Sequence, residues 1–276
     1  MFTMKLRKVT VAAATVLALT GTATACSNDK GSDEGKITVG IKYDQPGMGQ
    51  KTPGGDFAGF DVDVATYIAE QLGYKKGDIT FKETKTPDRE NALKNGDVKF
   101  IVGTYSITPE RDAQVDFAGP YFLAHQDLLV RSDSDVNKGT DLNGKTLCSV
   151  SGSTSAQNVQ KKIAPKAQLK RYNTYSECVS GLNSGAVDAM TTDDSILAGY
   201  AAQKQNKGKF KLLGLKLSNE NYGVGVKSGD KATKEKINKA IEKMVSSGAW
   251  EKAVKANLGP ADYENEPAPK IGEIKK

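Results

Sequence analysis

The stretch "FDVDVATYIAEQLG", residues 60–73, decides the architecture of this chain. Its larger apolar residues recur at intervals of four and form one stripe of a helix: Val64, Ile68 and Leu72. Asp61 and Asp63 lie in the first turn, where the helix dipole favours negative charge, and Gly73 marks the end. The pattern predicts a helix that packs one face against a sheet.

Short apolar runs flank this helix and predict strands. Strands are expected over residues 36–43, 78–84 and 98–107, with a short helix over 88–96. A second round of alternating strands and helices follows between residues 144 and 204. Two helices are expected over 230–259, with a core formed by Ile237, Ile241, Met244, Val245 and Trp250. This alternation is typical of α/β proteins, and the two rounds suggest two lobes.

The first 25 residues have the layout of a secretory signal. Lys5, Arg7 and Lys8 precede an apolar run over 9–19, which is shorter than the roughly 20 residues of a membrane span. Cys26 follows small residues and resembles the acceptor of a bacterial lipobox, in which the thiol receives a diacylglycerol, although Ala23 replaces the usual leucine. An ordinary cleavage site beside an incidental cysteine is the alternative.

Residues 26–35 are polar, and we expect a flexible tether that holds an exported protein on the outer face of the cell membrane. Loss of the signal lowers the formal charge from +6 to +3. Lysines are spread along the chain without interleaved aromatic residues, which argues against nucleic-acid binding. We therefore expect no nucleic-acid partner.

Cys148 and Cys178 are the cysteines that remain after the signal and Cys26. In an oxidising compartment the simplest interpretation is a disulfide, worth about 3.5 kcal/mol for a loop of roughly 30 residues. A metal site is disfavoured, because His125 is the one histidine and no close cysteine spacing occurs.

Common nucleophile and dinucleotide-binding motifs are absent from the sequence. The sequence contains no Gly-x-Ser-x-Gly, and the two Gly-x-Gly pairs lack a third glycine at the required spacing. We therefore expect no cofactor. Carboxylate spacing alone leaves acid–base chemistry open.

The segment "GTYSITPERDAQVDFAGPYF", residues 103–122, carries the strongest chemical pattern. Thr104 and Ser106 share one side where a strand ends, and the turn that follows lets Arg111 reach back over that end. Hydroxyls and a guanidinium fork together suit a carboxylate. The alternative is a surface ion pair of this arginine with a neighbouring acid: Glu110, Asp112 or Asp116.

Four fragments in this order, "GFDVDVATYIA", "SITPER", "VDFAGPYF" and "GAVDAMTTDD", resemble the solute-binding proteins of polar amino-acid ABC importers, bacterial extracellular solute-binding family 3. Further fragments, among them "GIKYDQPG", "LCSVSGST" and "NLGPADY", are similar to the glutamate-binding lipoproteins of actinobacterial importers. The resemblance runs from about residue 36 to residue 263.

The resemblance implies a type II periplasmic-binding-protein fold, in which two α/β lobes are joined by two crossover strands and enclose a ligand cleft. The crossovers are expected near residues 125–131 and 217–224. The expected divisions are 36–126 with 222–263 for the first lobe, 127–221 for the second, and 264–276 for a loose tail.

The resemblance also assigns the parts of a ligand site. Arg111 is the family's clamp for the α-carboxylate, assisted by Thr104 and Ser106 and by backbone N–H groups of a helix start that ends on Thr154. The partner of the α-ammonium is Asp193, with Asp194 as the alternative register.

Selectivity is expected from two further cations. Lys42 stands where relatives for other amino acids often carry an acid, and it suits a γ-carboxylate; Arg89 is the second candidate. The alternatives are a solvated Lys42 and an Arg89 that pairs with a nearby acid. The sequence thus predicts a monomeric, membrane-anchored receptor that hands L-glutamate to an importer permease.

The rival interpretations are a receptor for aspartate, glutamine or another polar amino acid, a lyase or dehydratase on the same fold, and a sensor subunit that presents its ligand to a signalling partner.

Overall fold

The computed structural model describes residues 35–276, which belong to one compact unit, Asp33–Lys276. The predicted signal peptide, Cys26 and the tether up to residue 34 lie outside the described residues. Within residues 35–276, no helix is both long and apolar enough to cross a membrane.

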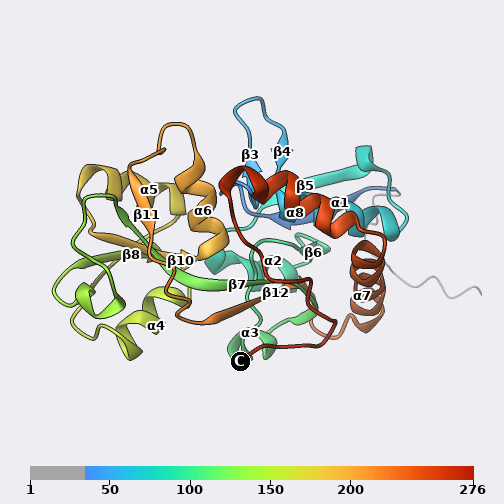
Figure 1. Ribbon diagram of the computed structural model, residues 1–276. Coiled ribbons are helices and arrows are strands. Elements are labelled where there is room, and N and C mark those ends of the chain that lie inside the picture. The colour runs from blue at the N-terminus through green and yellow to red at the C-terminus, as the bar shows by residue number, and fades with distance from the viewer. Residues whose placement is uncertain (1–34) are drawn as a thin grey trace, which may run out of the picture. The chain divides into compact units, whose positions relative to one another are not determined.

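The first lobe is built on the expected β-α-β-α-β unit (Figure 1). Its elements are β1 (Ile37–Ile41), α1 (Phe60–Gln71), β5 (Ile79–Glu83), α2 (Arg89–Lys94) and β6 (Phe100–Ile101). Strand β1 pairs in parallel with β5 on one side and with β6 on the other. The predicted elements are confirmed, except that the third strand is only two residues long, because the chain leaves the sheet after Ile101.

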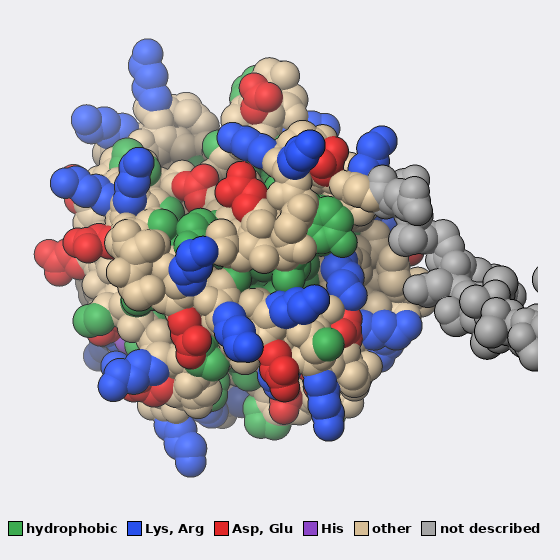
Figure 2. Space-filling view, turned by 90° about the vertical axis from the view of Figure 1, so that its right-hand side faces the viewer, with side chains coloured by type: hydrophobic (Ala, Val, Ile, Leu, Met, Phe, Trp, Pro, Cys, Tyr) green, Lys and Arg blue, Asp and Glu red, His purple; other side chains and the backbone are tan. Residues whose placement is uncertain are grey.

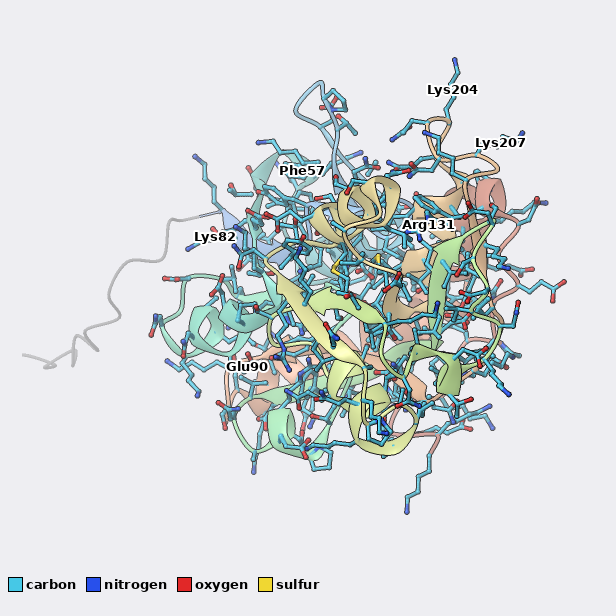
Figure 3. All side chains as sticks on the ribbon, turned by 90° about the vertical axis from the view of Figure 1, so that its left-hand side faces the viewer. Phe57, Lys82, Glu90, Arg131, Lys204 and Lys207 are labelled. Atoms are coloured by element: carbon cyan, nitrogen blue, oxygen red, sulfur yellow. A yellow bond between two sulfur atoms is a disulfide. The ribbon has the colours of Figure 1, made fainter. Side chains whose placement is uncertain are left out.

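The second lobe repeats the alternation. Its elements are β8 (Thr146–Val150), α4 (Ser155–Lys162), β9 (Gln168–Tyr172), α5 (Tyr175–Ser184), β10 (Ala189–Asp193), α6 (Asp194–Ala202) and β11 (Phe210–Leu212). Strand β8 pairs in parallel with both β9 and β10. On the face of this lobe seen in Figure 3, Lys204 and Lys207 extend into solvent from the loop after α6.

Two antiparallel strands connect the lobes. Strand β7 (Asp116–Arg131) pairs with β12 (Asn219–Val226) through its first part and with β10 through residues 126–130. Nine of the described strands thereby form one sheet in the order β5-β1-β6-β12-β7-β10-β8-β9, with β11 beside β7. Gln126 exchanges backbone hydrogen bonds with Ser218 and Leu217, so the chain crosses between the lobes at these positions.

Helices α7 (Lys231–Ser246) and α8 (Ala249–Leu258) complete the first lobe. Ile237, Ile241 and Met244 are buried as expected, and the Trp250 indole donates to the carbonyl of Tyr121 at 2.8 Å. Val245 was expected in this core but is 37% exposed. It lies one position past the apolar stripe, about 100° around the helix, and so faces solvent.

The remaining elements are short and were not predicted. They are β2 (Asp44–Gln45), β3 (Gly49–Lys51), β4 (Phe57–Ala58), α3 (Pro109–Asp112) and single 3₁₀ turns at Lys76–Asp78, Thr86–Asp88, Gly139–Leu142 and Gly259–Ala261. Strands β2, β3 and β4 form a separate antiparallel sheet above the first lobe in Figure 1. Two- and three-residue strands are too short to leave an alternating pattern in a sequence.

Cys148 of β8 and Cys178 of α5 form a disulfide, with their Cα atoms 5.8 Å apart. Both residues are fully buried in the second lobe. The predicted pairing is confirmed.

The C-terminal segment, residues 264–276, crosses both connecting strands and is not loosely attached as expected. Glu266 lies 3.0 Å from His125 Nε2, and the Gly272 N–H donates to the carbonyl of Gly119. The Asn221 side chain exchanges two hydrogen bonds with the backbone of Lys275. A polar, proline-containing composition suggested a free tail, but here its polar groups find partners along β7 and β12.

Positive and negative side chains are mixed over the surface that carries α1 and α7 (Figure 2). Lys231, Lys236 and Lys239 are exposed on α7, and Glu235 lies among them. This face therefore presents no large field of one sign.

Candidate functional site

A small polar cavity lies between the two lobes. The first lobe contributes Thr86, Arg89, Thr104, Ser106 and Arg111, and the second contributes Ser153, Thr154, Ser155, Tyr175 and Asp193. Six of the seven predicted ligand residues line it, four from the first lobe and two, Thr154 and Asp193, from the second.

Arg111 turns into the molecule from the short helix α3 and is only 8% exposed. Its Nη1 donates to the carbonyl of Ser106 at 2.9 Å, and its Nη2 donates across the cleft to the carbonyl of Gly152 at 3.2 Å. Its nearest acid among the described residues is Glu90, with Nε and Oε1 3.9 Å apart. The alternative of a surface pair with a neighbouring acid in the sequence is therefore wrong.

Arg89 begins α2 and is 2% exposed. Its guanidinium lies 3.9 Å from the centre of the Tyr105 ring, and its Nη1 donates to the carbonyl of Gly103. No carboxylate of residues 35–276 lies within ion-pair distance of it, in contrast with the alternative considered above. Burial, and then the charge of Arg111, lower the pKa of Arg89 to about 10, so it stays charged at neutral pH.

Thr104 and Ser106 both line the cavity, but not because they alternate along a strand. The strand ends at Ile101, and Thr104 has a left-handed backbone with φ of 44°. The Thr104 N–H donates to the buried carboxylate of Asp61 at 2.9 Å, and its hydroxyl pairs with Gln45. These contacts hold a backbone conformation that is uncommon for residues other than glycine.

The second lobe contributes the start of α4. Ser153, Thr154 and Ser155 form this turn, and Thr154 occupies the position just before the first helical residue. The first N–H groups of a helix have no partner within the helix and carry partial positive charge. This end of the cavity can therefore receive an anion.

Asp193 ends β10 and is 5% exposed. It accepts a hydrogen bond from the Tyr222 hydroxyl, which belongs to the first lobe. Burial, followed by the nearby charge of Glu220, raises the pKa of Asp193 well above its ordinary value. A positive group that entered the cavity would favour its ionised form.

Asp194 points away from the cavity. Its carboxylate accepts hydrogen bonds from the N–H groups of His125 and Ser195 and from the Tyr263 hydroxyl. Asp194 also lines a larger hollow beside α6, but there its carboxylate already accepts the three hydrogen bonds just described. Of the two alternative registers, the one with Asp193 at the cavity fits the structure.

Lys42 lies immediately behind the cavity wall. It is 3% exposed, so the alternative of a solvated side chain is wrong. Its Nζ donates to the hydroxyl of Thr86 at 3.2 Å and lies 6.0 Å from the centre of the Tyr175 ring. Burial, partly opposed by Asp44, lowers the pKa of Lys42 to about 8.

Four lining residues were not predicted. They are Thr86, Ser153, Ser155 and Tyr175. The serines flank Thr154 in "SGSTS", so the helix-start motif could have included them. Thr86 and Tyr175 carry no local signal, because they reach the cavity from a 3₁₀ turn and from the start of α5.

The described lining offers two guanidinium groups, one carboxylate, six hydroxyl-bearing Ser and Thr side chains, the ring of Tyr175 and a helix start. It contains neither histidine nor cysteine, and among residues 35–276 no cluster of metal-binding side chains occurs. Such a set can hold a small molecule that carries both signs of charge.

Residues 37–260 match the bacterial extracellular solute-binding proteins, family 3. The chain belongs to this family. It is 43% identical over 256 residues to the glutamate-binding protein GluB of Corynebacterium efficiens, covering 86% of each chain. It is 39% identical over 225 residues to the ABC transporter glutamine-binding protein GlnH of Bacillus subtilis, covering 81% of each chain.

Solved structures of family 3 relatives share the fold. An ancestral arginine-binding protein bound to glutamine has a TM-score of 0.75 at 36% identity, over 82% of this chain and 98% of that one. The ancestral amino acid-binding protein AncCDT-1, a precursor of cyclohexadienyl dehydratase, has a TM-score of 0.73 at 28% identity, over 82% and 96%. The predicted two-lobed, type II periplasmic-binding-protein fold is confirmed, and this family 3 protein is a solute-binding protein of the extracytoplasmic class.

Proposed function

We propose that this protein captures L-glutamate outside the cytoplasm and delivers it to the permease of an ABC importer. The observation that carries the proposal is the charge of the cavity. Two arginines and one aspartate line it. Glutamate has the complementary set, two carboxylates and one ammonium.

Each charged group of the ligand has a matching position. The α-carboxylate is assigned to Arg111, Thr104 and Ser106 and to the helix start at Thr154, since a guanidinium fork and the backbone N–H groups of a helix start suit carboxylate oxygens. The α-ammonium is assigned to Asp193, which lies in the other lobe.

The γ-carboxylate is assigned to Arg89 and to the pair formed by Thr86 and Lys42. Because Lys42 Nζ donates to the Thr86 hydroxyl, that hydroxyl is free to donate its own proton into the cavity. This end therefore presents donors, which favours a carboxylate over the amide of glutamine, whose NH₂ group would face further donors.

Capture requires no bond to be made or broken. The ligand's charges contact both lobes at once only when the lobes are closed, so its binding stabilises the closed form. The closed form would then be recognised by the permease, with the protein held at the membrane through a lipid on Cys26. The names of the relatives GluB and GlnH support an amino-acid ligand.

Calorimetric titration of the chain without residues 1–26 against the twenty amino acids tests the proposal. We expect glutamate to bind most tightly. The change Lys42→Met should weaken glutamate binding by roughly 10- to 100-fold, the value of a hydrogen bond to a charged group, and glutamine binding by less. Lys239→Met, an exposed lysine on α7, is the matched control. Equal affinities for glutamate and glutamine, both unchanged by Lys42→Met, would reject the acidic ligand.

A lyase is the second candidate, favoured by the likeness to a dehydratase precursor and by the raised pKa of Asp193, which suits a general acid. Incubation of the protein with carboxylated cyclohexadienyl compounds, followed by chromatography, tests it. Turnover lost in Asp193→Asn would support this candidate, and unchanged compounds would reject it.

A further inference from the structure

Strand β2 of the first lobe contacts two helices of the second lobe outside the cavity. Asp44 Oδ2 accepts hydrogen bonds from the N–H groups of Tyr175 at 2.7 Å and Ser176 at 3.4 Å. These are the first two residues of α5. A carboxylate of one lobe thus caps the positive end of a helix in the other.

The same residue binds a second helix. The hydroxyl of Tyr200 in α6 donates to the backbone carbonyl of Asp44, and it lies 3.5 Å from the carboxylate. Tyr200 is 3% exposed. Burial, and then the charge of Asp44, raise the pKa of Tyr200 well above its ordinary value, so the hydroxyl keeps its proton and remains a donor.

The backbones approach closely beside this contact. A Cβ atom at Gly199 of α6 would lie 1.9 Å from the carbonyl oxygen of Pro46, which no side chain can tolerate. Glycine inside a helix destabilises it by roughly 0.5–1 kcal/mol relative to alanine, so its presence here needs a reason. The close approach of β2 and α6 is that reason.

We propose that Asp44, Pro46, Gly199 and Tyr200 form an interlobe latch that stabilises the closed form and thereby sets the affinity for the ligand. The proposal rests on the proposed function, in which closure accompanies capture. None of the four residues lines the cavity. They join the lobes away from the connecting strands β7 and β12, and so these contacts must part when the lobes separate.

Tyr175 couples the latch to the cavity. Its N–H is bound by Asp44, whereas the residue itself is part of the cavity lining. Its hydroxyl accepts a hydrogen bond from Thr192, next to Asp193. The latch residues are therefore positioning residues that act through α5 and not through contact with the ligand.

The expected effect follows from the population of the closed form. When only the closed form binds tightly, the apparent Kd rises by the factor by which the closed population falls. Loss of a helix-capping carboxylate changes such an equilibrium by about three- to thirtyfold. Asp44→Ala should raise the Kd for glutamate by this factor, mainly through faster dissociation.

The test compares three variants: Asp44→Ala, Tyr200→Phe and Gly199→Ala. Gly181→Ala in α5 is the matched control, because a Cβ there meets only ordinary contacts at 3.5 Å or more. Stopped-flow binding gives Kd and the dissociation rate, and small-angle X-ray scattering without and with glutamate reports closure. We expect weaker binding, faster dissociation and a larger radius of gyration without ligand for the three variants, and wild-type values for the control.

The outcomes separate the latch from the proposed function. Wild-type binding of glutamate together with unchanged Kd and scattering in all three variants would reject the latch and leave the function standing. If the wild type bound no amino acid, the function would fail, while the scattering of the ligand-free variants would still decide whether the latch holds the lobes together.

Discussion

The two halves of the cavity are built in different ways. The first lobe presents two guanidinium groups, 3.9 Å and 5.4 Å from the centre of the Tyr105 ring, and backbone carbonyls of Ser106 and Gly103 orient them. The second lobe presents a helix start and one carboxylate whose raised pKa favours its neutral form. The first half is thus charged and oriented before any ligand binds, whereas the second acquires its charge when a positive group arrives.

This difference suggests an order of events. An anionic group docks first on the preorganised cations of the first lobe, since oriented groups lose little freedom on binding. The second lobe then closes on the ammonium and on the remaining carboxylate oxygens. Substitutions that change one half of the cavity and leave the other half intact test this order.

The largest effect is expected from the first half. Arg111→Ala should raise the Kd for glutamate by roughly 30- to several-thousand-fold, because truncating one partner of a buried charge pair costs about 2–5 kcal/mol. Isothermal titration calorimetry measures the change, and exposed Arg171→Ala in the second lobe is the control. A Kd equal to that of the control would remove Arg111 from the site.

The second lobe alone carries a disulfide among residues 35–276, with a sequence separation of 30. Replacing Cys148 and Cys178 together by serine should lower the free energy of unfolding by about 2–4 kcal/mol, because the unfolded loop gains entropy. Urea unfolding followed by circular dichroism measures the loss, and reduced wild-type protein should match the variant. An unchanged midpoint would contradict this account.

Asp193→Asn keeps the shape of the side chain but removes the charge that the second half presents. We expect glutamate affinity to fall by roughly 10- to 100-fold, the value of a hydrogen bond to a charged group. The dissociation rate should rise while the association rate changes little, since docking on the first lobe is spared. A slower association with unchanged dissociation would reverse the proposed order.

The pH dependence of Asp193 has a definite sign. Its raised pKa means that part of the free protein carries the neutral acid at low pH, and the ligand's ammonium stabilises the ionised form. Affinity should therefore increase with pH across the range in which the free carboxyl ionises, and binding should release protons. Calorimetry in two buffers of different ionisation enthalpy measures this release, and Asp193→Asn should abolish it.

The smallest effect is expected from the titration of Lys42. Because burial lowers its pKa to about 8, the ammonium that supports the γ-carboxylate is present below that pH and is lost above it. Glutamate affinity should fall between pH 7 and pH 9 by at most about tenfold per pH unit. Glutamine, which shares the α-groups, should show a shallower dependence, and Lys42→Met should make the two profiles parallel. Parallel profiles in the wild type would contradict the role of Lys42.

Local sequence signals predicted most of the fold. Helix α1 and its neighbours follow from apolar spacing and from Gly73, because these signals lie within one element. Strand β7 is sixteen residues long but contains Gly119 and Pro120, which interrupt a strand pattern, so only its second part was expected. The third strand was predicted too long, because the buried Asp61 that binds Thr104 and diverts the chain lies 43 residues away.

The site was predictable where a motif is short and continuous. Arg111 and Ser106 lie on one turn, and Thr154 begins α4. Thr86 and Tyr175 were missed because only tertiary packing brings a 3₁₀ turn and α5 to the same cavity. Lys42 was identified as a cation from its place in the chain, but its position behind Thr86 depends on contacts that no local pattern records.

The final residues of the chain bind to β12, one of the two strands that connect the lobes. Asn219 and Asn221 of β12 bind the backbone of Lys276 and Lys275. A fluorescent reporter fused after Lys276 would therefore disturb a strand that connects the lobes and alter the motion that it is meant to record. An insertion in the exposed turn between β3 and β4 would leave the connecting strands unchanged. This turn is therefore the better place for the reporter.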